Sequence, residues 1–193
     1  MAGDQQRAYD TYLVASARIG DREAWRRLVE RWQPRFLVHA WRLTGDADLA
    51  AEASQEAWVE VLRGIARLEE ARAFPAWSLR ILTRRCARLI RGRQRHRDAV
   101  GVLAVEPELG FDCPSDGEVL IDLTAVQRAL ETLSDEQRAV MGLFYLEEMS
   151  VAEVSVVLGI PPGTVKTRLM HARRKLQHKL EGEDDAQHRR ADQ

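Results

Sequence analysis

The sequence has few of the residues that build metal cages or disulfide frameworks. Only two cysteines occur among its 193 residues, Cys86 and Cys113, and neither belongs to a CxxC pair. A zinc cage or a disulfide framework is therefore not expected. Apolar runs are short, and none approaches the roughly 18 residues that a membrane-spanning helix needs. Because the polar N-terminus also lacks the apolar stretch of a signal peptide, we expect a cytoplasmic protein without membrane insertion.

The residue groups that perform catalysis are also missing. No nucleophile stands beside a base, and the sequence contains no glycine-rich phosphate cradle and no metal cluster. His171 and His178 lie seven residues apart on one helix face, but no nearby cysteine or carboxylate accompanies them, so a metal pair is not expected. The sequence therefore predicts no catalytic residue, no metal, no cofactor and no enzyme activity.

Alternating patterns of useful length, which would indicate β-strands, are lacking, and the pattern is helical nearly throughout. Asp21 is a suitable N-cap for a helix with an apolar stripe, which Pro34 should kink or break. Gly45 and Asp46 indicate the end of this helix and the start of the next one. Further helices are expected through Gln55, Trp58 and Leu62 and, after a loop near 68–73, from Pro75 to about Gly92.

Charge is segregated although the net charge is only −1. Residues 80–97 contain eight arginines and no acid, and residues 154–180 contain six Lys/Arg and no acid. Between them, residues 98–127 contain seven acids and no Lys or Arg. Two basic blocks separated by an acidic one indicate two surfaces that meet a polyanion, with a spacer that does not.

The fold class predicted from these features is all-α, with two small helical domains joined by a flexible acidic linker. We place the domains at residues 5–97 and 118–180, the linker at 98–117 and a polar, frayed tail at 181–193. Helices should resume near Val119, and capping-box patterns predict helix starts just after Ser134 and Ser150.

Residues 150–176 carry the strongest motif, a helix-turn-helix. Gly159 can adopt the left-handed conformation of a tight turn, and Pro161 and Pro162 preset the start of a second helix. Residues that pack the two helices together are Val154, Leu158, Val165 and Leu169, with a small Ser155 allowing their close approach. The second helix would present its N-terminal part to base edges in the major groove. Candidate base-reading residues are Thr164, Lys166, Thr167 and His171, and candidate phosphate contacts are Arg168, Arg173 and Arg174. The alternative is a helical hairpin with a solvated basic face.

The basic helix that begins at Pro75 is a second candidate for DNA contact. Its arginines recur at three- or four-residue spacing and share one face, which suits a phosphate backbone, although a solvated basic face is the plainer alternative. Phe74 and Trp77 could stack on bases, but for Trp77 packing in the core is favoured. The candidate residues are Phe74, Trp77, Arg80, Arg84, Arg85, Arg88 and Arg91.

The preceding acidic helix places Glu52, Gln55 and Glu56 on one face. Because no catalytic partner accompanies these carboxylates, a protein-docking surface or a plain solvated face fits better than acid–base chemistry.

Taken together, the two halves resemble an extracytoplasmic-function sigma factor of RNA polymerase, which consists of regions two and four. The C-terminal resemblance rests on segments 129–138, 150–153, 163–168 and 172–173, and the N-terminal one on 52–58, 74–77 and Ile81. It departs from the family at Arg84 and Arg88, where many members have Asn and Asp. These changes put the usual −10 specificity in doubt but not DNA binding.

The resemblance implies partners and roles. Region two would dock on RNA polymerase core through Glu52, Gln55 and Glu56, and would read and open the −10 element with the loop near 68–74 and the basic helix. Region four would read the −35 element with Thr164, Lys166, Thr167 and His171, and the linker would run toward the nascent RNA path. The family often works with an anti-sigma factor. Two other classes stay open, a dimeric helix-turn-helix repressor or activator and an RNA-binding protein.

Overall fold

The computed structural model describes the backbone of residues 2–100 and 132–191 and the side chains of 5–95 and 132–179. Within these ranges the chain is all-α and contains no strand. The expected all-α fold is therefore confirmed. The expected linker after residue 100 and the helix near Val119 lie outside the described residues. The N-terminal half comprises α1 (Ala2–Arg18), α2 (Arg22–Thr44), α3 (Ala47–Gly64), two 3₁₀ turns at Ile65–Arg67 and Ala71–Ala73, and α4 (Phe74–Val100). The C-terminal half comprises α6 (Asp135–Met141), a π-helical turn η3 (Gly142–Leu146), α7 (Val151–Leu158) and α8 (Pro162–Ala191).

Local signals set the helix boundaries of the N-terminal half. The Asp21 side chain caps α2 by accepting hydrogen bonds from the amides of Glu23 and Ala24. Gly45 ends that helix at a φ of 64°, and Asp46 caps α3 through the amide of Leu49. The predicted end of α2 and start of α3 are therefore confirmed. The αL glycine and the Asp cap satisfy backbone groups that the last and first helical turns leave unpaired.

Pro34 does not break α2, so of the two expected effects, a kink or a break, the break is wrong. The helix runs through it without interruption from Arg22 to Thr44. Proline removes only one hydrogen bond, and the buried side chains of Trp32 and Phe36 anchor the helix on both sides of it. Tertiary packing thus outweighs the local cost of the proline.

Two helices extend further than the sequence indicates. α4 ends at Val100 and not near Gly92, and α8 continues to Ala191 through the segment expected to be a frayed tail. Both segments are polar and lack the apolar periodicity on which the predicted ends were based. An isolated glycine such as Gly92 costs only about 1 kcal/mol in a helix and does not end this one.

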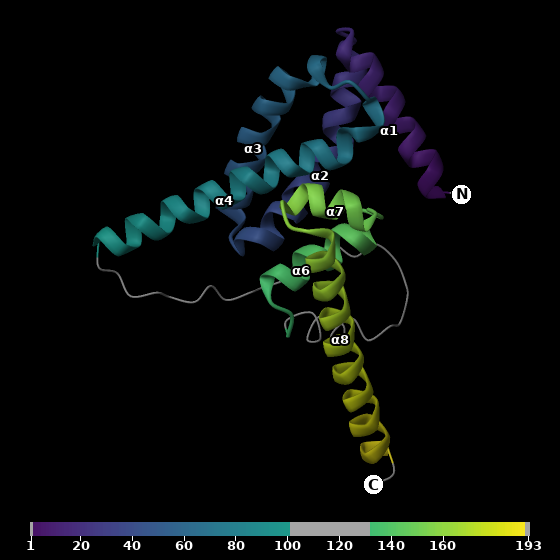
Figure 1. The fold of residues 1–193 in the computed structure, drawn as a ribbon, viewed down its shortest axis with the longest axis vertical. Helices are drawn as coiled ribbons and strands as arrows, with labels where there is room; N and C mark the ends of the chain where they lie inside the picture. Colours follow the sequence, from purple (N-terminus) through teal and green to yellow (C-terminus); the bar gives the residue numbers. More distant parts are fainter. Residues whose placement is uncertain (1, 101–131, 192–193) are drawn as a thin grey trace.

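An aromatic core holds α2, α3 and α4 together. Phe36 stacks on Trp58 of α3 with ring centroids 4.7 Å apart, and Trp32 meets Phe74 of α4 edge-on at 5.2 Å. The indole Nε1 of Trp58 donates a 2.6 Å hydrogen bond to Gln33 Oε1. These contacts fix the crossing of the acidic helix α3 and the basic helix α4, which lie side by side in Figure 1.

Both capping boxes in the C-terminal half are present as predicted. The Ser134 amide donates to Gln137 Oε1 and the Gln137 amide donates to Ser134 Oγ, at 3.2 and 3.3 Å. Ser150 and Glu153 form the same reciprocal pair at the start of α7. Each box satisfies donors that the first helical turn leaves free, so α6 and α7 begin where the sequence predicts.

The two halves pack against each other. α7 lies on α4, and α6 lies on α2, while α8 projects away from the N-terminal helices (Figure 1). Buried apolar residues of the C-terminal half join the N-terminal core in one continuous cluster; they are Val140, Leu143, Met149, Val154, Val157, Val165 and Leu169. The basic helix α4 and the first helix of the helix-turn-helix are therefore neighbours.

Candidate nucleic-acid and partner interfaces

The helix-turn-helix is closed by its turn. Gly159 has φ 66° and ψ 33°, and its amide donates a 2.9 Å hydrogen bond to the Ser155 carbonyl. Ser155 Oγ donates a 2.6 Å bond to the carbonyl of Ile160. Sequence reasoning assigned Ser155 only a small size and missed this bond, although serine near a helix end is a common donor to a turn carbonyl. Val154, Val165 and Leu169 are buried between the helices and Leu158 is half-buried, as expected.

The start of α8 presents an open polar edge. Lys166, Thr167 and His171 are exposed, and Thr164 is half-buried. Thr167 Oγ1 donates to the Gly163 carbonyl at 3.0 Å, so its oxygen keeps only acceptor capacity for an outside group. These four side chains occupy the part of a recognition helix that enters a major groove.

Two of the three arginines expected to hold phosphates are engaged within the protein. Arg168 pairs with Glu136 of α6 at 2.7 Å and only 24% of its side chain is exposed. Arg173 donates to Tyr145 Oη at 2.6 Å and lies over the Phe144 and Tyr145 rings. Both side chains tie α8 to the preceding helices, whereas Arg174 is exposed. The sequence could not reveal these pairs, because they depend on how α6 and α8 cross.

The arginine face of α4 is present as predicted, but it has acidic neighbours. Arg80, Arg84, Arg88 and Arg91 are exposed along one side of the helix. Arg84 pairs with Glu60 of α3 at 2.9 Å, and Arg85 pairs with Glu56 at 3.1 Å and also with Glu60. The Glu60 carboxylate raises the pKa of Arg85, against the opposing effect of burial. Sequence reasoning treated Arg84 and Arg85 as free and did not single out Glu60 as a partner.

Phe74, which by its position in the sequence could stack on bases, is not available to a base in this conformation. Its side chain is 0% exposed and contacts Trp32 and Trp77. From the sequence, a large aromatic residue next to an arginine stripe suits both packing in the core and stacking on a DNA base. Only the packing of α2 against α4 decides between these two roles. Trp77 is half-buried, in keeping with the favoured core placement, and its ring covers Gly64.

The expected docking face of α3 is only partly open. Glu52 and Gln55 are exposed, but Glu56 is half-buried and holds Arg85. Val59 and Leu62, further along α3, are exposed apolar residues that sequence reasoning did not include. Their exposure is seen only in the folded structure, so the sequence alone provides no signal for them.

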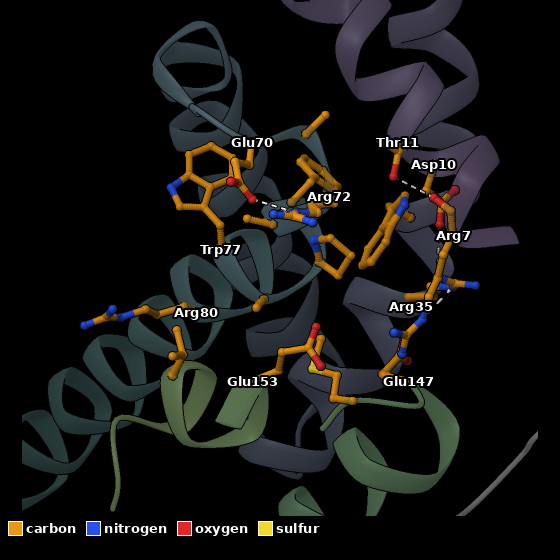
Figure 2. Close-up of a pocket in the computed structure, with 18 residues that line it drawn as sticks. Arg7, Asp10, Thr11, Arg35, Glu70, Arg72, Trp77, Arg80, Glu147 and Glu153 are labelled. Atoms are coloured by element: carbon orange, nitrogen blue, oxygen red, sulfur yellow. Dashed lines mark hydrogen bonds and ion pairs between the residues drawn. The ribbon is translucent and has the colours of Figure 1, made fainter. Parts of the chain in front are cut away.

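A cleft of about 530 Å³ lies where the two halves meet (Figure 2). Arg7 of α1 donates to the Glu148 carbonyl, and Arg35 of α2 lies 4.0 Å from the Glu147 carboxylate. Burial raises the pKa of Glu147, with Arg35 and Arg42 acting in the opposite direction. No sequence motif marked this acid, since its burial arises only from the contact between the halves.

The part of the chain that the structure describes shows no metal site, no reactive thiol and no membrane-spanning helix. No group of three His, Cys, Asp or Glu side chains there could hold a metal ion. Cys86 is buried, which raises the pKa of its thiol to about 12 and disfavours the reactive thiolate. None of the described helices is long and apolar enough to span a bilayer.

Comparison with known proteins gives the family. The pattern of sigma-70 region 2 matches residues 28–96, and the pattern of sigma-70 region 4 matches residues 123–176. The ECF RNA polymerase sigma factor SigM of Mycobacterium tuberculosis is 33% identical over 175 residues, covering 90% of this chain and 86% of that protein. This chain belongs to the extracytoplasmic-function sigma factors.

Other relatives agree with this assignment. The sigma factor SigW of Bacillus subtilis is 27% identical over 176 residues, covering 86% of this chain and 94% of that protein. The fold is shared with the sigma factor RpoE of Bartonella quintana, solved with the anti-sigma factor NepR, at a TM-score of 0.67 and 24% identity over 81% of this chain and 96% of that one. Sigma factors are transcription-initiation factors that act with RNA polymerase and are not enzymes.

Proposed function

We propose that this sigma factor reads two promoter elements, the −35 element with α7 and α8 and the −10 element with α4 and the turns before it. The observation that carries the proposal is the polar edge of Thr164, Lys166, Thr167 and His171 at the start of α8. It stands opposite the buried face of a closed helix-turn-helix. Arg174 would add a phosphate contact, and Arg168 and Arg173 would do so after leaving Glu136 and Tyr145.

The −10 element would meet the exposed arginines of α4. Arg80, Arg88 and Arg91 are suited to phosphates, because a guanidinium can form two parallel hydrogen bonds to phosphate oxygens. Trp77, half-buried at the start of the helix, is the candidate aromatic side chain for stacking on a base of the −10 element. The proposed functional units remain residues 5–97 and 118–180, with 98–117 as the linker and 181–193 as a tail.

The core enzyme would dock on α3 through Glu52, Gln55 and Glu56. Glu52 and Gln55 are open to a partner, and the exposed Val59 and Leu62 extend the face with apolar area. An anti-sigma factor is a further expected partner, because the solved relatives RpoE and CnrH are complexes with the anti-sigma factor NepR and the cytosolic domain of CnrY. The factor is expected to act in the cytoplasm, where polymerase core works.

Transcription in vitro with purified core polymerase tests this function. We expect the factor to form a stable complex with core and to start transcripts at a cognate promoter. Binding to duplex DNA without a core complex would favour a repressor or activator instead. Binding to RNA but to neither DNA nor core would favour the RNA-binding alternative.

Replacing Lys166 with alanine is expected to weaken holoenzyme binding at the −35 element by about 1–3 kcal/mol if the amine reads a base, and to reduce the salt slope by about 1. Lys166 is exposed within the first turns of α8. Promoter binding measured at several salt concentrations on wild-type and scrambled −35 sequences checks this. Lys179→Ala is the matched control, because it removes the same charge further along α8. An equal loss on both sequences would reduce Lys166 to a phosphate contact.

A further inference from the structure

One acid of α3, Glu60, faces the arginines of α4 in a cleft between these helices. The cleft has a volume of about 500 Å³. It is lined by four arginines, one alanine and a single carboxylate, namely Arg84, Arg85, Arg88, Arg91, Ala87 and Glu60. Glu60 uses both oxygens, with Oε1 accepting from Arg84 and Oε2 accepting from Arg85.

The two arginines that pair with Glu60 differ in their surroundings. Arg85 is 20% exposed and is held by both Glu56 and Glu60. Arg84 is 62% exposed and is held by Glu60 alone. An exposed pair contributes little to stability and exchanges readily, whereas a half-buried guanidinium with two carboxylate partners is costly to release. Arg84 can therefore leave Glu60 while Arg85 stays in place.

We propose that Glu60 is an internal counter-ion that occupies Arg84 until a DNA phosphate replaces it in this cleft. This inference rests on the proposed role of α4 in binding the −10 region. A phosphate brings the same kind of oxygen acceptors that Glu60 supplies, and Arg88 and Arg91 line the same cleft. Glu60 remains bound to Arg85 after the exchange.

The consequence is a restraint on DNA binding. In the wild type, part of the attraction between Arg84 and DNA is offset by the loss of its pair with Glu60. Removing the carboxylate charge is then expected to strengthen DNA binding, because Arg84 no longer has to give up an ion pair. The full charge of Arg84 then counts toward counter-ion release from the DNA.

The test is Glu60→Gln, which keeps the shape of the side chain and removes its charge. We expect affinity for a forked promoter DNA to rise about threefold, the size of one surface charge interaction, and the salt slope to steepen by about 0.9. Binding is measured by fluorescence anisotropy from low to physiological salt, for the free factor and for its core complex. Glu30→Gln is the matched control, because Glu30 forms an exposed pair with Arg26 on α2, away from this cleft.

A double substitution decides whether Arg84 carries the effect. Glu60→Gln is expected to have no effect on affinity or slope when Arg84 is already alanine. The proposal is overturned if the gain persists with Arg84→Ala, if Glu30→Gln gives an equal gain, or if no variant binds DNA. Thermal unfolding of each variant separates a change in stability from a change in binding. Failure of the factor to join core would refute the sigma function, but the comparison of free variants on DNA would still decide the role of Glu60.

Discussion

Replacing Phe74 with alanine is expected to lower the free energy of unfolding by about 3–5 kcal/mol, the usual cost of deleting a buried phenyl ring. Phe74 is 0% exposed and joins α4 to α2 through its edge-on contact with Trp32. The change leaves a cavity at the point that sets the crossing of α4. Chemical denaturation followed by tryptophan fluorescence measures the loss.

The same variant distinguishes packing from a role in DNA binding. Leu79→Ala is the control, because Leu79 is equally buried on α4 and its aliphatic side chain cannot stack on a base. Both variants should lose stability, and the fraction of each that remains folded at low temperature should bind forked DNA as the wild type does. A Phe74→Ala protein of normal stability that has lost affinity for forked DNA alone would instead establish base stacking.

Acidification from pH 7.5 to pH 5 is expected to cost about 2 kcal/mol of stability through one residue, His39. His39 is buried, and its Nε2 lies 3.0 Å from Thr83 Oγ1, whose hydroxyl donates to the Leu79 carbonyl at 2.8 Å. Burial, helped by the nearby charge of Arg42, lowers the pKa of His39 from 6.5 to about 3. The unfolded chain takes up a proton that the folded chain refuses, so this stability is present above pH 6.5 and is lost as the pH falls toward 3.

The measurement is the free energy of unfolding at the two pH values. His39→Gln keeps a donor for Thr83 but cannot titrate, so it should be less stable at neutral pH and lose about 2 kcal/mol less than the wild type on acidification. His171→Gln, at an exposed position of α8, is the matched control for the loss of a histidine. Equal losses in the wild type and His39→Gln would show that other groups cause the acid sensitivity.

What the sequence predicts well is what neighbouring residues determine. Asp21, Ser134 and Ser150 cap helices within three residues of themselves, and Gly159 makes its turn through its own backbone. These signals can be read from the chain because both partners are close in sequence. The helix-turn-helix and the arginine face of α4 follow from the same short-range periodicity.

What the sequence does not predict depends on how helices cross. Glu60 and Arg84 are 24 residues apart and meet only because the aromatic core fixes α3 beside α4. Phe74 lies at the boundary of an arginine stripe, so its position in the sequence is compatible with packing in the core and with contact to DNA. Only the position of α2 against α4 in the fold decides between the two. Pro34 was expected to kink or break its helix, because local rules do not include the contacts by which Trp32 and Phe36 anchor that helix.

The buried acid at the contact between the two halves has an energetic consequence. Only 9% of the Glu147 side chain is exposed, and Arg35 approaches it no closer than 4.0 Å. Its raised pKa means that the contact disfavours the ionised carboxylate, which regains full hydration when the halves part. Separating the two halves therefore costs less free energy than burial of the apolar cluster alone would require.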